Sequence, residues 1–427
     1  MAVYRIRGGQ KLKGTVTPEP NKNSILKIIP AIVLASEPVK IRNIPQSSSV
    51  KVMLQVFKQL GGKVTYHKDK SVTLDSTNIS NYIVDDLLAE KERASLMFLG
   101  PLVSRFKRAE IKSSGGCKLG NRPLDTMFQG LSALGVNIEK ENRYSLTTKG
   151  LKGAGRIWLI EASVTGTENI ILAAVMAKGR TEIYNGACEP HTQDLCNFLN
   201  SIGAKIEGIG TNRLIIDGVD RLGGGEWSII SDHIDIGGLI VASAMTGGEI
   251  TIQNAIPHHM TQILNYLGKL NLKVEINSDS ITIPENQDLI CKRNFKGNID
   301  KIVDQPWPGY PVDLIPQALV LALKAEGNIR IYSNMYETQL MFFEDLQKMH
   351  GELIVANPHQ IITFGPSNFK GARLNAPTVL QSAHALVLAG LAADGVTEIR
   401  EADIIARRYP RLVENLKSLG ADIEYER

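Results

Sequence analysis

A glycine-rich segment with one cysteine, KSSGGCKLGNRPLD, is the first place in the sequence where chemistry can be expected. Three cations lie close to Cys117 along the chain: Lys112, Lys118 and Arg122. A positive neighbourhood lowers the pKa of a thiol and favours the reactive thiolate. The glycines let the backbone move and let a ligand approach it. We interpret Cys117 as a general acid or nucleophile on a mobile lid; the alternative is an incidental surface thiol.

A second candidate is the segment EPNKNSILK, in which Lys22 and Asn23 lie where an extended stretch enters an apolar helix. The free N–H groups of a helix N-terminus attract anions, and Lys22 would add a positive charge there. The segment therefore suits an anion-binding site. Alternatively, it is a solvated helix cap in which Asn21 or Asn23 is the capping residue.

Asp313 ends a stiff segment, VDQPWPGYPVD, and precedes the apolar run LIPQALVLAL. A carboxylate held at the end of a rigid loop can serve as a general base. The same position suits a helix N-cap aspartate. The two interpretations are compatible, and both stay open at this point.

The C-terminal string IIARRYPRL contains two adjacent arginines, Arg407 and Arg408. Guanidinium groups suit phosphate and carboxylate recognition, and only one of two neighbours is expected to point into a given cleft. The alternative is a surface charge cluster. We expect no metal site, because the His258–His259 pair has no further histidine, cysteine or carboxylate at a metal-ligand spacing.

The elements that must position these residues repeat six times along the chain. Each repeat contains an amphipathic helix, a one-residue break and an alternating strand, as in NFLNSIGAKIEG and ENLKSLGADIEY. The break residues are Gly61, Gly135, Gly203, Asn271, His350 and Gly420, with successive spacings of 74, 68, 68, 79 and 70 residues. Gly, Asn and His tolerate the positive φ of a left-handed helix cap.

An upstream half repeats as well, as the end of an apolar helix, a turn and a strand; the second repeat, at FLGPLVSRFKRAEIKS, is the most diverged. Six repeats divide naturally into two sets of three. In each set we expect apolar helices inside and, outside, sheets with one solvent-exposed face. The alternative is one elongated stack of repeats. A ring-shaped DNA clamp is disfavoured, because it would need a strongly basic inner surface.

Composition excludes several classes of protein. Among 427 residues, 43% are hydrophobic and 22% charged, and the net charge of +4 is spread without a basic block, so we expect no nucleic acid partner. Apolar runs such as ILKIIPAIVLA are too short to span a bilayer, so no membrane association is expected. No secretory leader and no CxxC pair is found, which favours free thiols in a reducing cytoplasm.

Taken together, these motifs resemble the enolpyruvyl transferases, in particular those whose acceptor is UDP-N-acetylglucosamine. The resemblance covers the whole chain, and its most specific string is GGCKLGNRP around Cys117. It implies an α+β fold of two inside-out α/β barrels, built from six strand-helix units, with the active site between them. The first domain would comprise residues 1–21 and 231–427, with Asp313 and Arg407; the second, residues 22–230, would carry Cys117, Arg93 and Arg122.

The resemblance implies transfer of enolpyruvyl from phosphoenolpyruvate to a hydroxyl of UDP-N-acetylglucosamine, with release of phosphate, in peptidoglycan precursor synthesis. Cys117 would be the acid and Asp313 the base, with Lys22 the third catalytic residue. The anionic donor would be held by Lys22, Arg122 and Arg407, with help from Arg93. The nucleotide-sugar would contact Asn23, Pro123, Ser163 and Val164. The resemblance implies no cofactor, and we expect a monomer.

The chain departs from the family pattern at charged positions. The family has an Asp and an Arg two residues apart where this chain has Val379 and Gln381, or, with a one-residue gap, Thr378 and Leu380. It has an Arg where this chain has Gln339. A family lysine is replaced by Glu161 and a family histidine by Met127. Each lost charge-assisted hydrogen bond would weaken binding by roughly 1.5–3 kcal/mol.

These departures leave two further hypotheses beside the cell-wall enzyme. The chain is either a divergent enolpyruvyl transferase that acts on another nucleotide or sugar, or a catalytically silent binding protein on the same scaffold.

Overall fold

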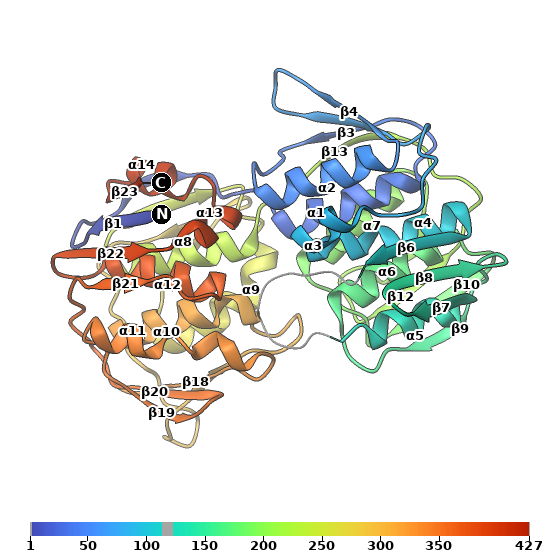
Figure 1. Ribbon diagram of the computed structural model, residues 1–427. Helices are drawn as coiled ribbons and strands as arrows, with labels where there is room; N and C mark the ends of the chain where they lie inside the picture. The colour runs from blue at the N-terminus through green and yellow to red at the C-terminus, as the bar shows by residue number, and fades with distance from the viewer. Residues whose placement is uncertain (1, 113–122, 427) are drawn as a thin grey trace. The chain divides into compact units, whose positions relative to one another are not determined.

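The computed structural model describes residues 2–112 and 123–426, which form two compact units (Figure 1). Within this range, unit 1 consists of residues 2–19 and 231–426, and unit 2 of residues 20–112 and 123–230. Sequence analysis put the first boundary after residue 21, whereas the contacts divide the chain after Glu19.

Six small sheets repeat one topology through the described residues. In five of them one strand pairs in parallel with an edge strand and antiparallel with its other neighbour, which pairs antiparallel with the fourth strand. The sixth, in the second repeat, has three strands, and its parallel partner is reduced to a single bridge between Ile83 and Glu110. The repeat that looked most diverged in sequence is therefore the one with the shortened sheet.

The strands alternate buried and exposed residues, as expected for sheets with one wet face. The sheets of unit 1 are β21 (Arg373–Asn375), β22 (Val396–Arg400), β1 (Val3–Arg7) and β23 (Asp422–Glu426); β15 (Glu275–Ile276), β16 (Ser280–Ile283), β14 (Glu249–Gln253) and β2 (Lys13–Val16); and β17 (Lys301–Val303), β18 (Arg330–Tyr332), β20 (Gln360–Thr363) and β19 (Leu353–Asn357). Those of unit 2 are β13 (Gly225–Ser228), β3 (Val39–Arg42), β5 (Val72–Asp75) and β4 (Lys63–Tyr66); β6 (Arg108–Lys112), β8 (Arg143–Thr148) and β7 (Val136–Lys140); and β11 (Lys205–Glu207), β12 (Arg213–Asp217), β10 (Arg180–Tyr184) and β9 (Gly155–Trp158).

Apolar helices form the inside of each unit. In unit 1 they are α8 (His233–Thr246), α10 (Ile315–Lys324) and α12 (Leu380–Leu391), which pack against one another and are buried over nearly their whole length. In unit 2 they are α1 (Lys22–Ala31) with η1 (Ile32–Leu34), η2 (Arg93–Phe98) with α4 (Leu99–Phe106), and α6 (Val164–Ala174). Burial on all sides explains why α6, α8 and α12 show little amphipathic pattern.

The amphipathic helices of the repeats are α2 (Ser48–Gln59), α5 (Asp125–Ala133), α7 (Pro190–Ser201), α9 (Pro257–Leu267) with η3 (Gly268–Leu270), α11 (Phe343–Lys348) and α14 (Leu412–Ser418). Shorter elements are α3 (Asp86–Lys91), α13 (Asp403–Arg408), η4 (Val312–Leu314) and η5 (Glu337–Leu340). All six predicted break residues have positive φ: Gly61 (106°), Gly135 (89°), Gly203 (110°), Asn271 (59°), His350 (65°) and Gly420 (95°). The shared capping device is therefore confirmed.

Each unit has its own hydrophobic core. One cluster of buried residues lies in unit 1 and a separate one in unit 2. The elongated stack of six repeats is therefore wrong, and the predicted fold of two three-repeat units, with helices inside and sheets outside, is confirmed. No helix in the described part of the chain is both long and apolar enough to cross a membrane.

Candidate active site

In unit 2 the predicted binding residues lie at the N-termini of inner helices. Lys22 and Asn23 are the first two residues of α1, and the Asn21 side chain caps the helix by accepting from the Ser24 N–H at 3.1 Å. Asn21, and not Asn23, is thus the capping residue. The Asn23 side chain, partly exposed, is left for other contacts.

The other two inner helices of unit 2 begin in the same way. Ser163 caps α6 by accepting from the Gly166 N–H at 3.3 Å, so that Val164 is its first helical residue. Arg93 is the first residue of η2. Five predicted residues of unit 2 thus lie at helix N-termini, where partial positive charge and free N–H groups favour anions such as phosphate: Lys22, Asn23, Arg93, Ser163 and Val164.

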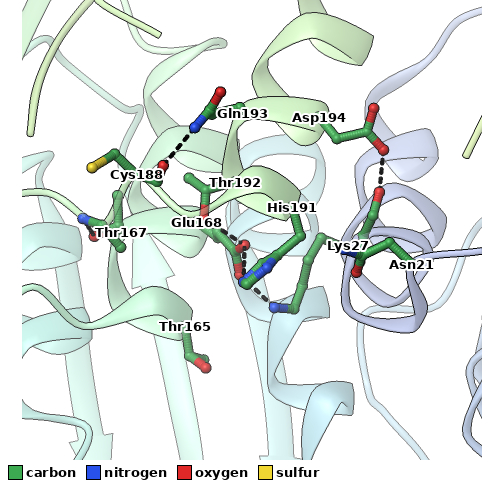
Figure 2. Close-up of polar contacts among 12 residues, drawn as sticks. Asn21, Lys27, Thr165, Thr167, Glu168, Cys188, His191, Thr192, Gln193 and Asp194 are labelled. Carbon is green, nitrogen blue, oxygen red and sulfur yellow. Dashed lines mark hydrogen bonds and ion pairs between the residues drawn. The ribbon is translucent and has the colours of Figure 1, made fainter. Parts of the chain in front are cut away.

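A buried ion pair ties two of these helices together below their N-termini. Lys27 of α1 lies 2.6 Å from Glu168 of α6, which is fully buried. Thr192 of α7 donates to the same carboxylate at 3.0 Å, and His191 lies 3.8 Å from it. Figure 2 shows Lys27 and His191 directed toward Glu168. Burial raises the pKa of Glu168, whereas Lys27 and Thr192 act in the opposite direction.

A second buried contact holds α1 against α7. The Ser24 hydroxyl donates to Asp194, whose other carboxylate oxygen accepts from the Trp227 indole at 3.2 Å. Burial raises the pKa of Asp194 to about 6. These contacts fix the helix that carries Lys22 and Asn23. Sequence analysis missed them, although a lone lysine within the apolar run ILKIIPAIVLA is a signal that a buried partner exists.

In unit 1 the predicted base lies beside a buried arginine. Asp313 is part of η4, just before α10, and its side chain is 30% exposed. It caps no helix, so the N-cap interpretation is wrong. Its carboxylate lies 3.7 Å from the Arg408 guanidinium, which also contacts Asp232, the N-cap of α8, at 2.8 Å.

Next to this arginine lies a buried network without formal charge. Gln381 of α12 accepts from the Gln317 amide at 3.1 Å and from the Tyr409 hydroxyl at 2.9 Å. The His384 ring lies 3.2 Å from the Gln317 amide and stacks on Tyr409. Burial, helped by the charge of Arg408, lowers the pKa of His384 to about 3, so the ring is neutral.

Gln339, Val379, Gln381 and Met127, four of the positions where the family pattern expects charge, are buried here. Gln339 is fully buried, and neither polar atom of its amide has a hydrogen-bond partner among the described residues. Val379 is buried immediately before α12. Met127 packs in the core of unit 2, whereas Glu161 is exposed to solvent.

Several predicted residues cannot be placed. Cys117 and Arg122, with Lys118, lie outside the described residues, and of Arg407 only the backbone, in α13, is described. Pro123 is exposed. Lys112, expected to act on the thiol, has its ammonium 2.8 Å from Glu90.

The remaining cysteines, Cys188, Cys196 and Cys291, are buried and form no disulfide within the described part of the chain, as expected for structural thiols. Burial raises the pKa of each, to about 11 for Cys188 and Cys291, which disfavours the reactive thiolate.

Known proteins match the chain along its length. A family profile for EPSP synthase (3-phosphoshikimate 1-carboxyvinyltransferase) matches residues 6–416. The UDP-N-acetylglucosamine 1-carboxyvinyltransferase of Borrelia garinii is 40% identical over 425 residues, and that of Treponema denticola 39% over 424, each match covering 99% of both chains.

Solved structures share the fold. The enolpyruvyl transferase NikO from Streptomyces tendae superposes with a TM-score of 0.87 at 23% identity, covering 99% of this chain and 98% of that one. An EPSP synthase from Acinetobacter baumannii gives 0.77 at 19% identity over the whole of both chains. By fold, by repeat organisation and by sequence along its whole length, the chain belongs to the enolpyruvyl transferase family.

Proposed function

We propose that the chain transfers the enolpyruvyl group of phosphoenolpyruvate to a hydroxyl of UDP-N-acetylglucosamine and releases phosphate, the first committed step of peptidoglycan precursor synthesis. The observation that supports UDP-N-acetylglucosamine as the acceptor is the full-length identity of 36–40% to relatives named for this reaction. The arrangement of unit 2 agrees with it, because three inner helices present their N-termini at the predicted binding residues.

The reaction adds the sugar hydroxyl across the enol double bond and then eliminates phosphate. The sugar oxygen bonds to the phosphate-bearing carbon as its proton passes to Asp313, and Cys117 protonates the methylene carbon. Loss of a proton from the new methyl group, together with loss of phosphate, restores the double bond. Asp313 suits the base, since its carboxylate is partly exposed and is not used as a helix cap.

The other predicted residues bind the substrates. Cations for the phosphate and carboxylate of the donor are Lys22, Arg93, Arg122 and Arg407. Contacts to the nucleotide-sugar are assigned to Asn23, Pro123, Ser163 and Val164. Cations and helix N-termini that are fixed before the reaction stabilise charge as it develops on the donor, without reorganisation at the moment of transfer.

The neutral side chains at 339 and 381 favour one alternative, a transferase with another nucleotide or sugar as acceptor. Phosphate release separates these functions. Release with phosphoenolpyruvate and UDP-N-acetylglucosamine supports the proposal, and release only with other uridine nucleotides or sugars supports the alternative. No release, combined with thermal stabilisation by UDP-N-acetylglucosamine, identifies a silent binding protein and overturns both transferase functions.

The proposal takes the chain to act as a cytoplasmic monomer. Three buried thiols without disulfides suit a reducing compartment. Light scattering during size-exclusion chromatography measures the molar mass, for which a monomer gives 46.8 kDa. Cell fractionation locates the protein.

A further inference from the structure

A buried guanidinium lies in unit 1 where the family pattern does not call for one. Arg408 is the middle residue of the Arg-x-Tyr string at 407–409 and ends α13, which packs against α12 (Figure 1). It is only 6% exposed. The arginines that the family resemblance implies are replaced by Gln339 and by Gln381 or, with a one-residue gap, Leu380; all three side chains are neutral, and both glutamines are buried.

The surroundings of Arg408 decide what its charge can do. The titratable and charged groups that act on it or on its neighbours are Asp232, Asp235, Asp313, His233, His384 and Tyr409. Burial, with the charge of Arg408, lowers the pKa of both histidines to about 3, so neither adds a cation. Burial also raises the pKa of Asp235 to about 7. Arg408 is therefore the buried cation of this cluster.

The geometry shows how this cation is shared. One guanidinium nitrogen lies 2.8 Å from Asp232, which is itself fixed because its other oxygen accepts from the Ile234 N–H at 3.0 Å. The second terminal nitrogen lies 3.7 Å from Asp313. A planar guanidinium can span two carboxylates in this way, whereas a lysine ammonium cannot keep both distances.

The backbone next to Arg408 is held independently. The Tyr409 hydroxyl donates to Gln381 at 2.9 Å, and the Tyr409 ring stacks on His384 with centroids 4.3 Å apart. Both partners belong to α12, so Tyr409, the neighbour of Arg408, is anchored to the same helix that lacks its expected arginine.

We propose that Arg408 is a positioning residue that orients Asp313 and holds a positive charge beside its carboxylate, and that it replaces the charge missing at 339 and at 380 or 381. The inference rests on the proposed function, in which Asp313 takes the proton of the acceptor hydroxyl. Arg408 reaches the chemistry through Asp313 and is assigned no contact with substrate.

Three variants test this role by the pH profile of kcat/KM. Arg408→Gln removes the cation, so the acid limb moves to higher pH by about one unit or more, and kcat falls roughly 10–100-fold. Asp232→Asn keeps the α8 cap but removes the anion that competes for Arg408, so the acid limb moves to lower pH. Arg400→Gln is the control, because it removes an arginine of the same unit whose partner, Glu398 at 2.7 Å, lies outside this cluster; kcat/KM and its profile should not change.

A titration that needs no turnover separates this inference from the proposed function. With aspartate labelled at the side-chain carboxyl carbon, and Asp313→Asn used for assignment, NMR should show the Asp313 midpoint moving up in Arg408→Gln and down in Asp232→Asn. An inactive wild type with these shifts would overturn the reaction but not the positioning role. If Arg408→Gln folds and the Asp313 midpoint does not move, the role of Arg408 is overturned. If Arg408→Gln does not fold, an unmoved midpoint in Asp232→Asn overturns it.

Discussion

At the scale of single residues, the structure identifies three of the cysteines as structural. Cys188, Cys196 and Cys291 are buried with raised pKa values, so they should be inert toward alkylating agents in the native protein. Cys117 is the thiol that the sequence marks as accessible and activated.

This difference gives a first prediction. In the native protein, iodoacetamide should label Cys117 alone, and Cys117→Ala should abolish labelling and lower turnover at least 100-fold. Mass spectrometry of peptides locates the label, and phosphate release measures turnover. Cys291→Ala is the control and should change neither result. Normal turnover in Cys117→Ala would refute its role as acid.

A second residue-scale prediction concerns pH. Burial raises the pKa of Asp235 to about 7, and its carboxyl accepts from the Glu19 N–H at 2.7 Å. The unfolded chain releases this proton near pH 4, so the native state holds one proton more between about pH 4 and 7. The stability that Asp235 contributes is thus present at low pH and is lost as pH rises through 7.

Asp235→Asn should remove that loss. The free energy of unfolding of the variant, measured in urea from pH 5 to 8, should rise relative to wild type as pH increases. Asn keeps an oxygen for the Glu19 N–H. A difference between variant and wild type that is the same at every pH would contradict the assignment.

Residue contacts mark the limit of what the sequence could predict. The run ILKIIPAIVLA shows that Lys27 must be buried, but its partner Glu168 is 141 residues away and many carboxylates were possible. Arg407 and Arg408 likewise could not be ranked by sequence. The direction of Arg408 is set by Asp232 and Tyr409, and only the folded chain brings those contacts together.

At the scale of elements, local chemistry made prediction possible. The left-handed break needs a residue that tolerates positive φ, which depends on a few neighbouring residues and recurs in every repeat. The six helix caps could therefore be predicted from the sequence. Asp313 shows the opposite case. Its place in the sequence suits an N-cap, but its carboxylate lies 3.7 Å from the Arg408 guanidinium instead.

A cap also gives a clean test of backbone strain. Gly420 has φ of 95°, and an added Cβ would meet no atom closer than 3.9 Å, so Gly420→Ala should destabilise the protein by about 1–2 kcal/mol through φ alone. Gly268 has ordinary helical φ and open space, so Gly268→Ala should be neutral or slightly stabilising. Chemical denaturation measures both. If both substitutions changed the free energy of unfolding equally, backbone strain at Gly420 would not be the explanation.

At the scale of the whole molecule, the two cores are separate clusters. Leu388→Ala in α12 and Leu172→Ala in α6 each open a cavity in one core and should destabilise it by about 2–5 kcal/mol. Hydrogen exchange followed by mass spectrometry should show faster exchange confined to the unit that carries the substitution. Equally accelerated exchange in both units after either change would contradict separate cores.

Strand β1 pairs with both β22 and β23, so the two ends of the described chain share one sheet of unit 1 (Figure 1). During translation, every described strand of unit 2 has been synthesised by residue 230, whereas β1 waits for partners that begin at residue 396, roughly 390 residues after β1 ends. At 5–20 residues per second, that wait lasts on the order of 20–80 s. The N-terminal strand is therefore an unpaired edge for that time, the period in which a chaperone would be needed most.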